Sequence, residues 1–322
     1  MDKEDKLLKY VGDFYLGEKN LGSTGELVGS GGHGGAFDVV GSGDNLVVKV
    51  TTSDIEAGVV KRRLLNHNKE GIIKYYDIMK INVADNVQKK FNVTNFDELY
   101  CITMEKINTK SCWIRPVFYI IHRDLKNGKV SKGKIIQSKL LKDPEVQKLL
   151  ERTPIEYKKL IIESIYDNIY DVINDYDFFF DVLPDKVIKI YKKKLRLLYI
   201  ELKNKLITYR KDIINKPFSN ILNKDNIREL FGDNIESIQD YVDYSEDEVV
   251  ELIISVVKMM DDVVSLGIVN RDMNPDNIGI KDKKFVIFDI MDTSMVINRD
   301  ECENLSLKEQ IKEAFFSILH KN

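Results

Sequence analysis

The feature that most constrains this chain is a polar segment set between apolar runs near its C-terminal end. Residues 269–280 read VNRDMNPDNIGI, and residues 285–289 read FVIFD. Apolar residues flank the polar ones, which predicts short buried strands joined by a tight turn. The segment holds an acid at Asp272, an amide at Asn277 and a second acid at Asp289. One interpretation is purely structural, an Asn-Pro-Asp turn between two core strands.

A glycine-rich segment lies near the N-terminal end. Residues 26–40 read ELVGSGGHGGAFDVV, and the apolar residues on both sides predict strand, loop and strand. Gly29, Gly31 and Gly34 have the GxGxxG spacing. Glycine lets backbone N–H groups approach phosphate oxygens because no Cβ intervenes. A Rossmann turn has the same spacing, but a helix follows it, whereas a second apolar run follows here.

A lysine interrupts the valine-rich run that comes next. Residues 46–50 read LVVKV, and the Gly-Ser-Gly-Asp-Asn segment before them predicts a hairpin turn. Because a lysine is costly to bury without a partner, Lys49 is either paired or on an exposed strand face. A helix expected from Ser53 to about Leu65 carries the candidate partner, Glu56. Glu56 is also the glutamate of a Ser-x-x-Glu capping box, and both roles remain open.

The other N-terminal segments are expected to be simpler. Residues 1–25 predict a short extension. Residues 72–76 and 91–93 predict further strands, and residues 100–106, which read YCITMEK, predict the last strand of this part.

Residues 108–244 predict a long, mainly helical stretch. A capping pattern at Thr153 begins one helix, whose apolar spacing extends to Phe180. Another helix follows Pro184, and its polar faces carry many lysines and arginines over residues 186–211. The simplest interpretation is a solvated face; the alternative is a docking surface for an acidic partner, lipid headgroups or nucleic acid.

A further capping box, Ser245-x-x-Glu248, opens a helix that is expected to stop at Gly267. This helix leads directly into residues 269–280.

Taken in order, the glycine-rich segment, the Val-Val-Lys run, the Met-Glu pair within residues 100–106 and the segment 269–289 resemble the protein-kinase superfamily. The similarity is to divergent Ser/Thr protein kinases of viral or bacterial type with a shortened C-lobe. The resemblance implies an α+β, bilobal fold. The β-rich N-lobe would span residues 1–106, and the mainly helical C-lobe would span residues 107–322, with the long helical stretch before the catalytic loop.

The resemblance also implies a role for each matching residue. Asp272 would orient or deprotonate the acceptor hydroxyl, and Asn277 and Asp289 would hold Mg²⁺. Lys49, paired with Glu56, would hold the α- and β-phosphates of ATP. The implied nucleotide-binding residues are Gly29, Ser30, Gly31, Gly32, His33 and Gly34 in the loop, Lys49, and Met104, Glu105 and Ile107 at the hinge. His33, at the loop tip, is expected to be exposed to solvent.

The implied function is transfer of the γ-phosphoryl group of ATP to a hydroxyl, that of Ser or Thr in a protein substrate. A small-molecule kinase of the aminoglycoside or choline type and a catalytically inactive kinase-like binding module are the alternatives. Several positions depart from the family pattern: Asn270 replaces a histidine, Asn274 replaces a lysine, and Ile290 and Met291 replace Phe-Gly.

Residues 122–126, HRDLK, match the kinase catalytic loop more literally than residues 269–280 do. Lys129 stands where that loop would need an asparagine, and no strand ending in aspartate follows. Asp124 is therefore expected in a polar loop between two strands, away from the site.

Composition narrows the compartment and the partners. The net charge of −3 does not indicate a nucleic-acid binder. The scattered Cys101, Cys112 and Cys302 form no CxxC motif, which argues against a zinc site or a disulfide framework. No uncharged run is long enough to span a bilayer, and the charged N-terminus is unlike a signal peptide. We expect a cytoplasmic protein, in the host cytoplasm if it is a viral protein or a bacterial effector.

Overall fold

A computed structural model describes residues 2–41, 45–127, 131–151, 153, 158, 161, 180–181, 183, 185–214, 216–268 and 275–290. The chain is α+β and divides into two compact units. The first unit comprises Met1–Arg123 and Asp233–Lys321, and the second comprises Asp124–Gly232 with Asn322. The two units are defined by contacts between residues, and their boundaries differ from the expected lobes. The division into an N-lobe at 1–106 and a C-lobe at 107–322 therefore stays a prediction.

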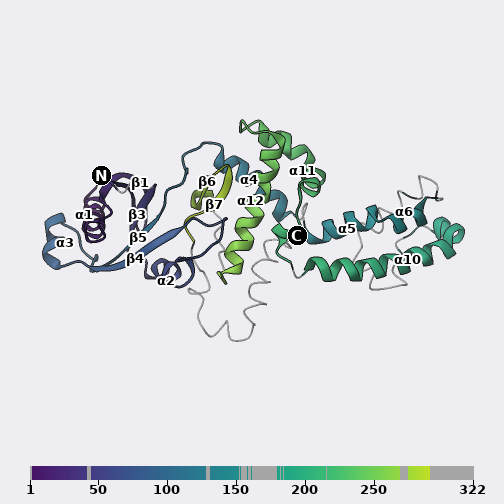
Figure 1. Cartoon of the computed structure of the whole chain (residues 1–322), viewed down its shortest axis with the longest axis horizontal. Coiled ribbons are helices and arrows are strands. Elements are labelled where there is room, and N and C mark those ends of the chain that lie inside the picture. Colours follow the sequence, from purple (N-terminus) through teal and green to yellow (C-terminus); the bar gives the residue numbers. More distant parts are fainter. Residues whose placement is uncertain are drawn as a thin grey trace. The chain divides into compact units, whose positions relative to one another are not determined.

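The first unit is built on a five-stranded antiparallel sheet with the strand order β1-β2-β3-β5-β4 (Figure 1). Its strands are β1 (Ser23–Gly31), β2 (Gly34–Val40), β3 (Leu46–Thr51), β4 (Tyr75–Asn82) and β5 (Glu98–Glu105). Gly31 pairs with Gly34 across the first hairpin, which confirms the expected strand, loop and strand. The antiparallel pairing of β2 with β3 confirms the second expected hairpin.

Helix α1 (Lys3–Glu18) occupies the segment that the sequence analysis assigned to an extension. Asp2 and Asp5 form a reciprocal capping box at its start. Its buried residues Leu7, Leu8, Val11, Tyr15 and Leu16 form one core with Phe37, Val48, Val50, Leu99 and Cys101 of the sheet. The expectation of an extension was wrong because these apolar residues recur at helical spacing and cover one face of the sheet.

The helix expected from Ser53 is confirmed as α2 (Asp54–Val59), which continues into a π-helical turn, η1 (Val60–Leu64). The strand expected at residues 91–93 is wrong. Phe91 ends helix α3 (Asp85–Phe91), and Asn92 follows in the left-handed region at φ 54°. Asparagine tolerates that conformation, so it closes the helix where a β-branched residue would be strained.

The segment around residues 72–76 forms less strand than expected. Strand β4 begins only at Tyr75, and Ile72 instead makes an isolated parallel bridge to Ile287.

Helix α12 (Glu246–Ser265) and the hairpin of β6 (Ile278–Lys281) and β7 (Lys284–Ile287) complete the first unit. The expected capping box at Ser245 is present, and Gly267 lies just past the helix at φ 69°. Asp282 and Lys283 both have positive φ, as a tight hairpin turn requires. The Ser255 hydroxyl of α12 accepts a hydrogen bond from the Phe285 N–H, which ties the hairpin to the helix.

Residues 122–126 lie in helix α4 (Ile114–Lys126), not in a loop between strands. Val117, Phe118, Ile121 and Leu125 are buried at helical spacing, and the Asp124 side chain is buried with them. The expectation of a polar loop was wrong because the apolar residues around the His-Arg-Asp letters form a helical face.

The second unit is helical in its described residues, as expected. It contains α5 (Lys132–Lys142), α6 (Pro144–Leu150), α10 (Asp185–Ile214) and η2 (Phe218–Asn220). Helix α11 (Lys224–Gln239) crosses the boundary between the units with a kink at Gly232. Most of the helix expected from Thr153 to Phe180 lies outside the described residues.

Helix α10 packs against α5 and α6. Asp143, the N-cap of α6, accepts a hydrogen bond from the Tyr209 hydroxyl and pairs with Lys205 of α10. In the described part of the chain, no helix is both long enough and apolar enough to cross a membrane.

Candidate functional site

A cavity of about 930 Å³ opens in the first unit beneath the β1–β2 hairpin. The hairpin, the end of β5 with the residues after it, and residues 275–278 with 288–289 line it. All the described residues that the sequence predicted for the site line this cavity: Gly29, Ser30, Gly31, Gly32, His33, Gly34, Lys49, Glu56, Met104, Glu105, Ile107, Asn277 and Asp289. Asp272 lies outside the described residues.

The alternation of side chains along β3 places Lys49 in the cavity. Val48 and Val50 point into the core beneath α1, so Val47 and Lys49 point to the opposite face of the sheet, where the cavity lies. A one-residue shift in register would bury the lysine under α1 and remove its charge from the cavity.

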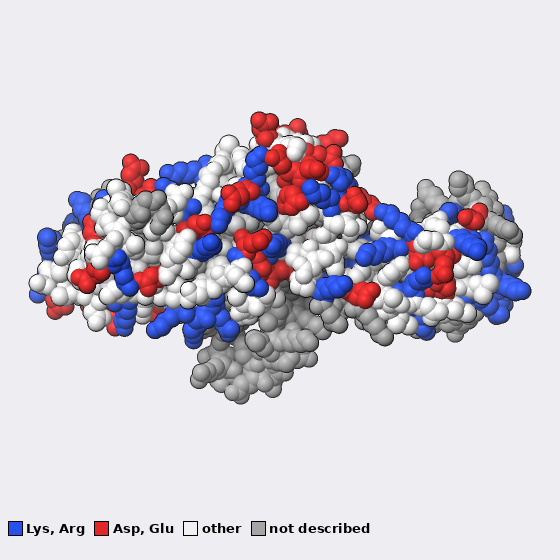
Figure 2. All heavy atoms as spheres, viewed as in Figure 1, with Lys and Arg blue, Asp and Glu red and all other residues white. Residues whose placement is uncertain are grey.

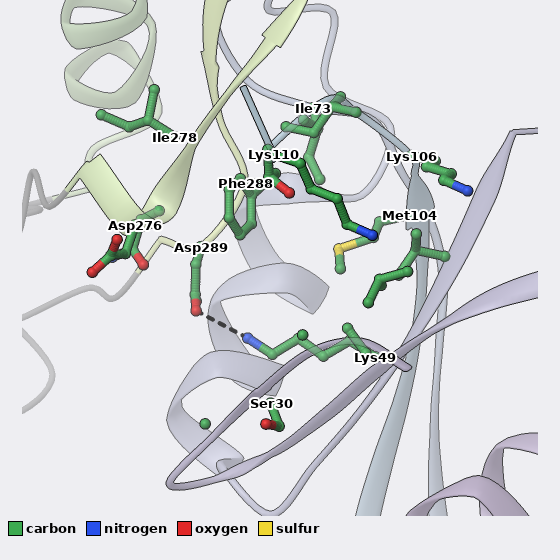
Figure 3. Close-up of a pocket in the computed structure, with 18 of the residues that line it drawn as sticks. Ser30, Lys49, Ile73, Met104, Lys106, Lys110, Asp276, Ile278, Phe288 and Asp289 are labelled. Carbon is green, nitrogen blue, oxygen red and sulfur yellow. Dashed lines mark hydrogen bonds and ion pairs between the residues drawn. The ribbon is translucent and has the colours of Figure 1, made fainter. Parts of the chain in front are cut away.

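Lys49 contacts two carboxylates. Its Nζ lies 2.6 Å from Glu56 Oε1 and 3.1 Å from Asp289 Oδ2. Figure 3 shows the lysine side chain extending across the cavity from β3 toward Asp289. The expected pairing of Lys49 with Glu56 is present. The Glu56 backbone N–H donates to Ser53 Oγ at 3.1 Å, so the Ser53 side chain caps α2. The Glu56 carboxylate is paired with Lys49.

The shared ammonium group sets the pKa values of this cluster. Burial alone would lower the pKa of Lys49, but the charges of Glu56 and Asp289 together raise it above its ordinary value. Burial raises the pKa of Glu56, and Asp289 adds to that effect against the opposing charge of Lys49. The cluster therefore carries one more acid than base, which a bound cation would compensate.

The loop glycines divide into two kinds. A Cβ added at Gly29, Gly31 or Gly32 would meet no atom within 4 Å, so space is open beside these residues. A Cβ at Gly34 would lie 2.0 Å from the Val50 carbonyl oxygen, so this glycine allows β2 and β3 to approach. His33 is exposed, as expected, and its carbonyl oxygen accepts a hydrogen bond from the Thr52 N–H at 2.8 Å.

The chain after β5 forms the opposite wall. The Glu105 N–H donates to the Lys74 carbonyl and the Lys106 N–H donates to the Asn45 carbonyl. Among the described residues, no partner of the Ile107 N–H is found. Ile107 lines the cavity, so its N–H group is available to a ligand there.

Gly279 allows residues 107–108 to lie against β6. A Cβ at Gly279 would approach Ile107 Cδ1 to 2.3 Å and the Asn108 carbonyl oxygen to 2.9 Å. Asn108 and Ile280 exchange backbone hydrogen bonds of 3.2 and 2.8 Å beside it. A side chain at position 279 would force these segments apart.

Backbone contacts also fix Asn277 and Asp289 near each other. The Phe288 N–H donates to the Asn277 carbonyl at 3.0 Å, so the residue before Asp289 is tied to Asn277. The hydroxyl of Tyr75 donates to the Phe288 carbonyl. Burial, followed by the charges of Glu56 and Asp289, raises the pKa of Tyr75 well above its ordinary value, so this hydroxyl stays protonated.

Asn277 and Asp289 are a donor set that fits Mg²⁺. A carboxylate and an amide carbonyl are oxygen ligands of the kind that Mg²⁺ prefers, and this ion keeps several waters or phosphate oxygens as its remaining ligands. Within the described ranges, no cluster of three or more His, Cys, Asp or Glu side chains could hold a metal ion by itself. A metal here would need a ligand that brings its own oxygens.

The sequence analysis missed several residues of the cavity wall. Asp38 on β2 pairs with Lys106 at 2.9 Å, and Arg115 pairs with Asp276. Alternation along β2 could have placed Asp38 on the cavity face with Ala36. The second pair joins residues far apart in the chain, and no local pattern indicates it.

No protein-family model matches this chain, and no curated protein matches it at a significant level.

Proposed function

We propose that this chain is an ATP-dependent phosphotransferase with a bilobal, protein-kinase-like arrangement. The observation that carries the proposal is the position of Lys49 between Glu56 and Asp289, beneath a glycine-rich hairpin and in a cavity that Asn277 also lines. A lysine held by a carboxylate, with a second carboxylate and an amide across the cavity, provides the charges that a Mg²⁺-triphosphate requires.

Each described residue has a role in this proposal. Lys49 binds phosphate oxygens of ATP, and Glu56 keeps its side chain oriented toward them. Asn277 and Asp289 hold Mg²⁺, which would neutralise the negative charge on the phosphates. The open space beside Gly31 admits the triphosphate close to the backbone.

The nucleobase would lie between Met104 and the hinge. The Ile107 N–H is its hydrogen-bond donor, since the N–H groups of Glu105 and Lys106 are already engaged. The acceptor is a hydroxyl, and we propose a protein Ser or Thr, with Asp272 as the group that orients or deprotonates it. A cytoplasmic location, where ATP and Mg²⁺ are abundant, agrees with this function.

The test measures binding and transfer separately. Mg-ATP should raise the thermal unfolding midpoint of the wild-type chain by mass action. Phosphate transfer from ATP labelled at the γ-position is then measured with Ser- and Thr-containing peptides, and in parallel with aminoglycosides and choline.

Asp289→Asn should retain the fold and lose transfer, whereas the matched control Asp282→Asn in the exposed β6–β7 turn should transfer at the wild-type rate. Binding of Mg-ATP without transfer to any acceptor would favour a kinase-like binding module. The absence of a thermal shift at millimolar Mg-ATP would overturn the nucleotide site itself.

A further inference from the structure

Helix α10 exposes a row of large aliphatic side chains. Ile190, Leu197, Ile200 and Ile207 have 56%, 51%, 53% and 47% of their surface exposed. Steps of seven, three and seven residues place them on one side of the helix. Single exposed aliphatic residues are common on protein surfaces, but a row of them along one helix indicates a surface that contacts something else.

The opposite side of α10 is already used. Leu195, Leu198, Leu202 and Leu206 are buried, and the helix packs with them against α5 and α6. The row from Ile190 to Ile207 therefore lies on the face that the described residues of the second unit leave exposed. At about 1.5 Å per residue, the row extends over roughly 25 Å.

Basic side chains alternate with this row. Lys189, Lys193, Arg196 and Lys203 are exposed and lie on the same side of the helix by their spacing. Within the described residues, no acidic partner is found for Lys189, Lys193 or Arg196. Lys205, on the flank toward α6, differs because it pairs with Asp143 and Glu145.

Acidic residues are fewer than basic ones on α10. Asp185 lies in the first turn, and Asp212 lies near the end of the helix. Glu201 lies on the side of the aliphatic row by its spacing, and its carboxylate is 3.8 Å from Lys205. In Figure 2, Lys and Arg lie over the region of α6 and α10, with a smaller group of acidic side chains among them. The exposed face of α10 thus combines aliphatic side chains with an excess of basic over acidic residues.

We propose that this face of α10 binds the surface of a membrane that contains anionic phospholipids. The aliphatic side chains would enter the boundary between headgroups and acyl chains, as in helices that lie in the plane of a membrane. The lysines and arginine would extend along the helix to the headgroup phosphates and carboxylates. Nucleic acid fits less well, because it would contact the positive charges but leave the four aliphatic side chains in water.

This membrane site does not depend on the proposed transfer of phosphate. If both hold, binding through α10 would concentrate the chain at the membrane, and the acceptor would be found among membrane-associated hydroxyl compounds or proteins.

The experiment is co-sedimentation of the full chain with phosphatidylcholine vesicles, with and without phosphatidylserine. We expect wild type to sediment only with the phosphatidylserine vesicles, and less in high salt. Lys189→Glu/Lys193→Glu/Arg196→Glu should weaken binding at least about 100-fold, since each basic residue near an anionic surface contributes about 1 kcal/mol. Ile190→Ser/Leu197→Ser/Ile200→Ser should weaken it at least about tenfold, because the side chains no longer leave water.

The matched control is Lys3→Glu/Lys6→Glu/Lys89→Glu, which makes the same change in net charge at exposed residues of the first unit. It should sediment as wild type does, and circular dichroism should show that every variant is folded. Failure of wild type to sediment with phosphatidylserine vesicles would overturn the proposal. Equal binding by the serine variant would also overturn it, because charge alone would then suffice, as for a polyanion or an acidic protein.

Discussion

Lys49 on β3 and Glu56 on α2 are in direct contact, with 2.6 Å between Nζ and Oε1. Only 19% of the lysine side chain and 10% of the glutamate side chain are exposed. A buried ion pair adds little stability by itself, but removal of one partner leaves a charge that is neither paired nor hydrated. The pair thus ties the position of α2 to β3, and its loss should be measurable even without a ligand.

Lys49→Met should lower the free energy of unfolding by about 3 kcal/mol near neutral pH, because it leaves the Glu56 carboxylate buried without its cation. The pKa of Glu56 is already raised by burial, and loss of Lys49 raises it further. A carboxyl whose pKa is higher in the folded state favours the fold when protonated. Both proteins lose stability as the pH rises above the unfolded value of 4.5. The gap between them should widen once the pH passes the raised pKa of Glu56 in wild type, because only the variant then still binds this proton in the folded state.

The control for this effect is Lys49→Met/Glu56→Gln. It also removes the Glu56 carboxylate, which the single variant leaves buried without a cation. Denaturant unfolding followed from pH 4 to pH 8 should show no gap that widens with pH for the double variant, because no carboxyl remains at position 56 to titrate. A gap that still widens with pH in the double variant would assign the effect to another group.

Gly31 and Gly34 should respond to alanine in opposite ways. Gly31→Ala should keep the wild-type unfolding midpoint, since a Cβ there meets nothing within 4 Å, but should weaken Mg-ATP binding about tenfold. Gly34→Ala should lose about 1–3 kcal/mol of stability, because its Cβ would collide with the Val50 carbonyl. Calorimetric titration with Mg-ATP measures the affinity of each variant, and thermal unfolding measures its stability. Unaltered nucleotide affinity in Gly31→Ala would remove the loop from the proposed site.

Substitution of Asp272 should affect turnover, whereas substitution of Asp124 should affect stability. Asp272→Ala should reduce turnover at least about 100-fold, the usual effect of removing a positioned acid–base group. Asp124 is fully buried in α4, so Asp124→Ala should lower thermal stability while turnover per folded molecule stays near wild type. Initial rates at saturating Mg-ATP, corrected for the folded fraction, test both. An inactive but stable Asp124→Ala would contradict the assignment.

Glu248 should make the start of α12 sensitive to acid. Its hydrogen bonds to Lys283 and to the Ser245 backbone and hydroxyl lower its pKa to about 2. A carboxyl with a lower pKa in the folded state stabilises the fold above its unfolded value of 4.5 and loses that contribution as the pH falls toward 2. Thermal unfolding of wild type and Glu248→Gln should therefore differ at pH 6 and converge near pH 2. A constant difference across this range would rule out the carboxylate as its source.

The parts of the fold that the sequence predicted correctly depend on local patterns. The hairpin at Gly31, the strand that carries Lys49 and the capping box at Ser245 each follow from neighbouring residues, whose backbone preferences the fold retains. Those elements bring most of the candidate site residues to the cavity. Asp38 and Lys106 could not be paired in advance, because their contact depends on how β2 and the end of β5 align in space.

The wrong predictions concern sequence segments that are compatible with more than one secondary structure. Phe91 and Val93 have strand propensity, but the preceding residues favour a helix that Asn92 can end. Residues 122–124 match a His-Arg-Asp motif, and this match led to the prediction of a loop. The burial pattern around Asp124 is that of a helix. In each case packing against other segments decided between conformations of similar local preference.

The β6–β7 hairpin is attached to the chain at two backbone bridges, Asn108 with Ile280 and Ile72 with Ile287. Any opening of the cavity that preserves these hydrogen bonds must turn about the line that joins them, so the bridges act as a pivot. Amide hydrogens of Ile280 and Ile287 should then exchange slowly with solvent deuterium whether or not nucleotide is present. Those of the glycine turn should exchange quickly and become protected only when it binds.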